Sequence, residues 1–239
     1  MIEYNRHIEE YVNYWFGDFN KLVPEKEWGN QKLAEEYLQK YWLPEQEYLN
    51  IWKPIQDKVF VLGKSLPDLI YQAEFEMIAL RGGCLFIEKD FKQLQKAMQE
   101  VGEDYFVIIQ HSQDFTEGEP MFKMKFPVNI TWEELTSGNY ISAVLLEMSY
   151  NEYLVFGASG KWGKYSATEF ENPVDIIGYK TEFASIFKQH FKQSKEEQEE
   201  IKKWLPLSTK NLLVKGKRLE KGVHKQRGFS KSLYTILNI

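Results

Sequence analysis

The stretch Y-N-E-Y-L-V-F-G-A-S-G-K-W-G-K-Y-S-A-T-E-F-E-N-P-V-D-I-I-G-Y, residues 150–179, has the densest turn signals in the chain. Its glycines lie at positions 157, 160, 163 and 178. Glycine suits places where the backbone needs a positive φ or approaches another segment closely. Trp162 and Tyr165 put large aromatic surfaces beside these turns. The stretch predicts strands joined by a tight turn, with both rings either packed on a sheet or presented to a partner.

Further strands are predicted on the N-terminal side of this stretch. Residues 73–80 and 121–126 alternate apolar and charged side chains, which is the pattern of half-exposed strands. A Gly-Gly turn between the first of these segments and residues 84–87 predicts a hairpin. Residues 141–148 and 153–156 predict a second hairpin. These strand pairs favour an antiparallel or mixed sheet.

Helical patterns lie in two groups, before and between the strands. The first 55 residues repeat their apolar positions at helical spacing, and residues 91–101 form an amphipathic helix that Asp90 is expected to cap. Grouped helices beside paired strands predict an α+β fold with flanking helices, rather than a doubly wound parallel sheet. We expect one body over residues 1–193, helical over 1–55 and sheet-centred over 56–193. A charged helix and basic tail would follow over 194–239.

Charge is distributed unevenly along the chain. From Lys202 onward there are ten Lys or Arg residues and one acid, a balance of +9; since the whole chain carries −5, residues 1–201 carry −14. An acidic body attracts cationic partners, and a basic tail can meet nucleic acid or fold back on the body. Both kinds of contact therefore stay open at this point.

The ends and the cysteine content indicate a cytoplasmic protein. The N-terminus lacks the apolar run of a signal peptide, and no window approaches the roughly 18 apolar residues of a membrane span. A single cysteine, Cys84, excludes an internal disulfide and a cysteine-based zinc cluster. The four histidines are too dispersed for a recognisable metal signature. We therefore predict no metal and no cofactor.

Three patterns invite a catalytic interpretation, and each has a simpler one. G-A-S-G-K at 157–161 lacks the spacing of a phosphate-binding loop and is followed by Trp162, so a structural turn is the better interpretation. Cys84 and His111 are the only residues that could imitate a thiol and its base, but a lone cysteine in an apolar strand is usually an inert core residue. Glu74 and Glu76 form a carboxylate pair, for which cross-strand ion pairing with the lysines at 123 and 125 is the simpler explanation. An enzyme would need residues that are distant in sequence.

The motif Y-L-V-F-G-A-S-G-K-W-G-K-Y, followed by E-N-P-V-D-I-I-G-Y, resembles small cytoplasmic bacterial proteins of polymorphic-toxin loci, in particular immunity proteins. The likeness covers about thirty residues and singles out no one family, and the basic tail lies outside it. The resemblance implies a non-enzymatic protein that occludes a toxin. The acidity of residues 1–201 is a separate argument, because it would suit a cationic toxin.

The leading functional hypothesis is therefore a protein-binding module. Its predicted partner-binding residues are Trp162 and Tyr165 as anchors, with Glu169, Glu171 and Asp175 as acids that steer a cationic surface. The alternative is a nucleic-acid-associated protein that uses cations of the tail. Those cations are Lys215, Lys217, Arg218, Lys225 and Arg227. An enzyme whose site forms only in three dimensions is the remaining alternative.

Overall fold

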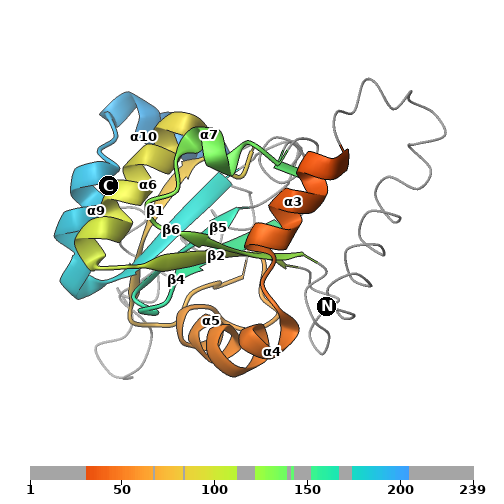
Figure 1. Cartoon of the computed structure of the whole chain (residues 1–239). Coiled ribbons are helices and arrows are strands. Elements are labelled where there is room, and N and C mark those ends of the chain that lie inside the picture. The colour runs from red at the N-terminus through yellow and green to blue at the C-terminus, as the bar shows by residue number, and fades with distance from the viewer. Residues whose placement is uncertain are drawn as a thin grey trace.

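A six-stranded antiparallel sheet forms the centre of the molecule (Figure 1). The computed structural model describes residues 31–66, 68–82, 84–111, 122–138, 141–142, 152–166 and 174–204. In spatial order the strands are β1 (Phe75–Arg81), β6 (Val174–Lys180), β5 (Trp162–Ser166), β4 (Glu152–Gly157), β2 (Tyr105–His111) and β3 (Lys123–Pro127). All neighbours pair antiparallel. The predicted α+β class is confirmed.

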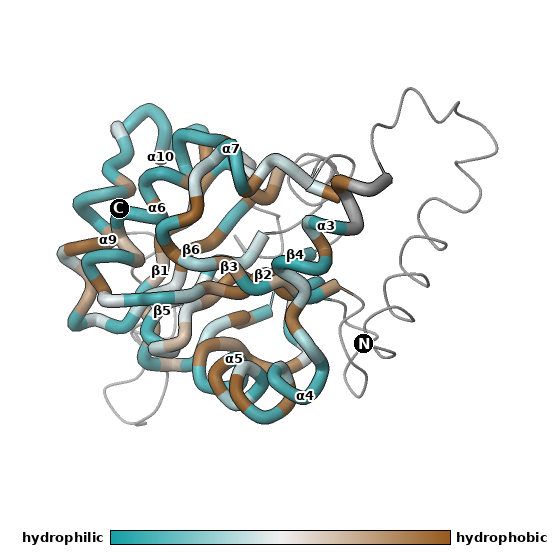
Figure 2. The backbone as a smooth tube through the Cα atoms, in the orientation of Figure 1, coloured by the Kyte–Doolittle hydropathy of each residue, from teal (hydrophilic) through white to brown (hydrophobic). Residues whose placement is uncertain are grey.

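Helices cover both faces of the sheet. The first face, which carries Ile78, Val155 and Ile177, packs against α3 (Gln31–Tyr41), α6 (Glu88–Val101), α7 (Trp132–Leu135) and α9 (Ala184–His190). The second face packs against η2 (Tyr48–Trp52) and α5 (Lys53–Val59), which follow the short α4 (Glu45–Glu47). Helix η4 (Thr181–Phe183) leads into α9, and α10 (Lys195–Trp204) contacts β1. Figure 2 shows hydrophobic residues on the central strands and hydrophilic ones on the outer turns of α6 and α10.

The quoted stretch forms the β4–β5 hairpin and then β6. Gly163 and Gly178 lie opposite each other in the β5–β6 register. A Cβ at Gly163 would lie 2.5 Å from the ring of Phe60, and a Cβ at Gly178 would lie 2.4 Å from the ring of Tyr71. The Tyr71 hydroxyl donates to the carbonyl of Ile176 at 2.6 Å. The two glycines therefore provide the space in which these rings pack flat on the second face.

The turn of the hairpin is built around a buried carboxylate. Glu103, which lies between α6 and β2, accepts hydrogen bonds from the Ser159 amide at 3.0 Å and from the Trp162 indole Nε1 at 2.9 Å. The Ser159 hydroxyl donates to the same carboxylate. Gly157 leaves room for it, because a Cβ there would lie 2.3 Å from the carboxyl carbon. The glycine and tryptophan of this motif thus have a structural role.

Several local predictions are corrected. Residues 84–87 form no strand, and β1 pairs with the distant β6 instead of forming a hairpin. Helix α6 begins at Glu88, so Asp90 lies in its first turn rather than at the cap, which is Ile87. Ile141 and Ser142 are helical, and the rest of the predicted strand 141–148 lies outside the described residues. The amphipathic helix predicted over residues 91–101 is confirmed, since α6 buries Phe91, Leu94, Met98 and Val101.

Candidate functional site

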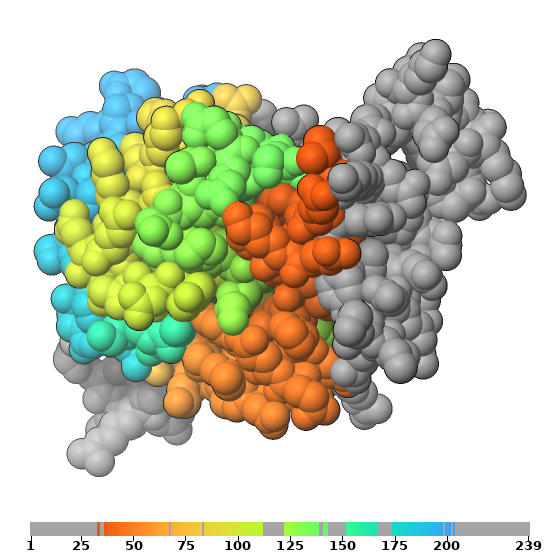
Figure 3. All heavy atoms as spheres, in the orientation of Figure 1, coloured from red at the N-terminus to blue at the C-terminus, as the bar shows by residue number. Residues whose placement is uncertain are grey.

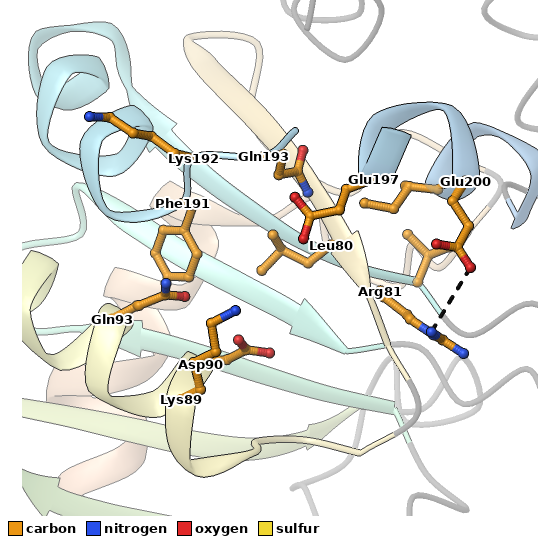
Figure 4. Close-up of a pocket in the computed structure, with 12 residues that line it drawn as sticks. Leu80, Arg81, Lys89, Asp90, Gln93, Phe191, Lys192, Gln193, Glu197 and Glu200 are labelled. Atoms are coloured by element: carbon orange, nitrogen blue, oxygen red, sulfur yellow. Dashed lines mark ion pairs between the residues drawn. The ribbon is translucent and has the colours of Figure 1, made fainter. Parts of the chain in front are cut away.

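A hollow of about 210 Å³ lies at one corner of the molecule, where α6, α10, the end of α9 and the edge strand β1 meet. Figure 3 shows the residues of α6 in yellow and those of α9 and α10 in blue adjoining at this side. Phe191 and Val174 are buried, and Leu80 and Ile201 are half-buried, so they make an apolar floor. The rim is polar and charged (Figure 4); it consists of Arg81, Lys89, Asp90, Gln93, Lys192, Gln193, Glu197 and Glu200.

The segment after α9 forms one side of the hollow and is hydrogen-bonded to the edge strand β1 and to the start of α10. The Gln193 amide donates to the Ala79 carbonyl at 2.8 Å, which satisfies a backbone group of the edge strand. Ser194 and Glu197 form a reciprocal capping box at the start of α10, with bonds of 2.7 and 3.1 Å. The carboxylate of Glu197 is therefore already engaged. The hollow is held in shape by these bonds between its own walls.

Asp90 is the unusual member of the rim. It is half-buried and points from α6 into the hollow (Figure 4), and it has no hydrogen bond or ion pair to any residue in the described part of the chain. Burial raises the pKa of this carboxyl group, and the ammonium groups of Lys164 and Lys89 oppose that shift. A half-buried carboxylate without a donor is a costly arrangement that a ligand can relieve.

Behind Asp90 lies a polar cluster inside the core. The Lys164 ammonium contacts Asp175 Oδ2 at 2.5 Å and donates to the Leu85 carbonyl at 2.6 Å. The Ser166 hydroxyl donates to Asp175 Oδ1 at 2.7 Å. Burial raises the pKa of Asp175, and the Lys164 ammonium and the Ser166 hydroxyl offset part of the shift. Because Lys164 is bonded to Asp175 and Leu85, it attracts Asp90 only at longer range.

A second group of polar side chains lies on the second face, where β2 ends and β4 begins. The Ser65 hydroxyl donates to Glu152 Oε2 at 2.5 Å, and His111 Nε2 lies 2.9 Å from the Lys64 carbonyl and 3.8 Å from Glu152 Oε2. Burial lowers the pKa of His111, and the Glu152 carboxylate opposes this. Ser65 is only 4% exposed, and His111 contacts the backbone rather than the serine. The group fastens the segment after α5 to the sheet.

Three of the five predicted partner-binding residues lie inside the core. Trp162 and Tyr165 are 0% exposed and Asp175 is 4% exposed, so these three are core residues and not surface anchors or steering charges. The physical reason is that both faces of β5 and β6 are covered by other segments. Glu169 and Glu171 lie outside the described residues. The tail cations Lys215, Lys217, Arg218, Lys225 and Arg227 also lie outside them.

The candidate catalytic residues are dispersed. Glu76 on β1 pairs with Lys188 of α9 at 2.9 Å, rather than with the lysines at 123 and 125. Those lysines belong to β3, at the opposite edge of the sheet, so the predicted cross-strand pairing is wrong. None of Glu74, Glu76, Cys84 and His111 lines the hollow. The hollow was not predicted from the sequence. The one available signal was the position of Asp90 directly before the apolar stripe of a helix.

The described residues contain neither a metal-binding cluster nor a membrane-spanning helix. No group of three or more His, Cys, Asp or Glu residues in that part of the chain is placed to hold a metal ion. Within the same residues, no helix combines the length and the apolar character needed to cross a bilayer. Comparison of the chain with protein-family models, with curated proteins and with solved structures finds no match.

Proposed function

We propose that the protein is a binding module that recognises another protein through the hollow between α6, α10 and β1. The observation that carries this proposal is the combination of an apolar floor with an exposed charged rim. Apolar contact surrounded by polar groups is the usual arrangement of a protein-binding surface. The aromatic residues Trp162 and Tyr165 of the β4–β5 hairpin are buried in the core and do not line this surface.

The size of the hollow favours one side chain of a partner over a whole small molecule. Pockets for drug-sized ligands and cofactors measure about 300 to 1,000 Å³. The hollow measures about 210 Å³, and its rim residues Arg81, Lys89, Lys192 and Glu200 are exposed. An exposed rim around a small depression leaves the rest of the partner outside, where it can contact neighbouring surfaces. This geometry suits a projecting side chain.

An enzymatic alternative would use Ser65 and Glu152, whose hydroxyl and carboxylate lie 2.5 Å apart on the second face. Its nucleophile would need access to substrate and a base that removes its proton. Ser65 is buried, and its partner Glu152 also lies near the His111 ring. Burial of Ser65 limits access of a substrate to its hydroxyl in this conformation, so the binding function is better supported.

The class of partner follows from the sequence and stays a prediction. The excess of acids over residues 1–201 favours a cationic protein, and the local resemblance to immunity proteins suggests a toxin met in the cytoplasm. Binding of nucleic acid by the tail is the alternative, and it would show as an affinity that falls steeply with salt. A protein partner held at the hollow should show its salt dependence mainly in the association rate, because salt screens the charges that steer the encounter but not the apolar contact.

The proposal is tested by filling the hollow. Gln93 is a half-buried rim residue on α6, and Gln99 is exposed on the same helix. We expect Gln93→Trp to abolish capture of a partner from the native host, because the added ring occupies the space for the partner's side chain. Gln99→Trp should leave capture unchanged. Equal capture by both variants, with the fold intact, would remove the hollow from the interface.

A further inference from the structure

We propose that the hollow is a receptor for one cationic side chain, arginine or lysine, whose charge is balanced by Asp90. This inference rests on the proposed function, because it names the chemistry of the partner group that enters the hollow. It follows from the juxtaposition of an unpaired, half-buried carboxylate with the apolar surfaces of Leu80 and Phe191.

Charge complementarity within the hollow points to a cation. The Glu197 carboxylate accepts from the Ser194 amide, and Glu200 lies 4.0 Å from the Arg81 guanidinium. Asp90 alone among the acids that line the hollow has neither kind of partner in the described part of the chain. A guanidinium or ammonium group could supply the missing donors, and a charge-assisted hydrogen bond of this kind is stronger than a neutral one.

The cations of the rim do not reverse this preference. Lys89 and Lys192 are exposed, so water and salt screen their charges. Asp90 is half-buried between α6 and the floor, where the local dielectric is lower and its interactions are less screened. The inner part of the hollow therefore favours a positively charged group. The lysines of the rim can contact an acidic residue that neighbours this group on the partner.

The floor is suited to the stem of such a side chain. Arginine and lysine carry apolar methylene groups behind a charged head, and the two parts prefer different surroundings. Phe191 is 6% exposed and presents its ring to the hollow beside Leu80 (Figure 4). The methylene groups can pack on these residues, and a guanidinium can also lie over the aromatic ring, which favours arginine.

A competing explanation for Asp90 is its place in the first turn of α6. An acid there is stabilised by the positive end of the helix dipole whether or not a ligand binds. That explanation accounts for the acid but predicts no role in recognition. The two explanations therefore differ in what Asp90→Asn does to binding.

The experiment is a titration followed by two-dimensional NMR, with capped arginine amide as the probe and capped citrulline amide as its neutral isostere. Wild-type protein should show shifts of amide signals from α6 and residues 191–193 with the arginine probe, and at least tenfold weaker binding of citrulline. Asp90→Asn should abolish this preference. Asp104→Asn, an exposed aspartate just beyond the other end of α6, should retain it.

Each other outcome overturns the inference. Equal binding of the arginine and citrulline probes by the wild type would show that the hollow does not recognise the positive charge. If the preference for arginine survives in Asp90→Asn, another residue is responsible for it. If a glutamate amide binds more strongly than the arginine amide, the hollow prefers an anion. No shift with arginine up to roughly 50 mM would rule out a useful cation site. If arginine fails but partner capture still depends on Gln93, the proposed function stands without this inference; if capture ignores Gln93, the proposed function fails.

Discussion

Glu103 and Gly157 share one space in the β4–β5 turn, and this makes their substitutions interdependent. Glu103→Ala leaves the Trp162 indole N–H buried without an acceptor, whereas the donors of Ser159 can reach water because Ser159 is exposed. One orphaned buried donor costs about 1 to 3 kcal/mol, and the lost bonds to the charged group add to it. We expect a loss of about 2 to 4 kcal/mol in the free energy of unfolding.

Gly157→Ala should cost somewhat less, for a related reason. Its Cβ would lie within 2.3–2.7 Å of the Glu103 carboxyl atoms, so the carboxylate must move. The side chain is flexible, but moving it breaks the same hydrogen bonds, which gives a loss of about 1 to 3 kcal/mol. The double variant should therefore cost little more than Glu103→Ala alone. The expected coupling between the two sites is about 1 to 2 kcal/mol.

Urea unfolding followed by tryptophan fluorescence measures all four proteins in this cycle. Glu103→Gln provides the control, because it keeps an acceptor for Trp162 and should cost about 1 kcal/mol. Strictly additive losses, or a Glu103→Ala variant within about 0.5 kcal/mol of wild type, would refute the structural role given to this motif.

Three further predictions concern the core and the hollow. Asp175→Ala should destabilise the fold by about 3 to 5 kcal/mol, because it leaves the Lys164 ammonium buried without its ion-pair partner. In a denaturant titration, the double variant Asp175→Leu with Lys164→Met should recover most of this loss. Tyr71→Phe should cost about 1 to 2 kcal/mol in the same assay, since a buried strand carbonyl loses its donor. Asp90→Asn should be at least as stable as wild type near neutral pH, because burial raises the folded-state pKa and so makes the ionised form unfavourable. This difference should shrink in melts as the pH falls through the raised pKa towards the ordinary value of 3.8, and a variant less stable than wild type at neutral pH would contradict the reasoning.

Local patterns of residues predicted the elements that depend on local interactions. The apolar stripe of α6 repeats at helical spacing, and the glycine-rich turn at 157–161 joins two neighbouring strands, so both could be recognised without tertiary information. The β1 hairpin prediction failed because strand pairing is not local. The partner of β1 is β6, roughly a hundred residues away in the chain.

The site was harder to predict for two physical reasons. Alternation along a strand indicates one polar face only when that face meets water, and helices cover both faces here, so Lys164 and Asp175 are inside the core. The hollow combines short segments of β1, α6, the end of α9 and α10, whose proximity depends on the whole fold. Asp90 was recognised as an acid at a helix start, but its direction into a hollow is a tertiary property.

The most direct test of the account is an isotope-filtered nuclear Overhauser measurement on wild-type protein with capped arginine amide. We expect contacts between the methylene protons of the arginine and the ring protons of Phe191, and we expect them to disappear in Asp90→Asn. Contacts to another surface, or contacts to Phe191 that persist without the Asp90 carboxylate, would contradict the claim that this hollow reads a cationic side chain.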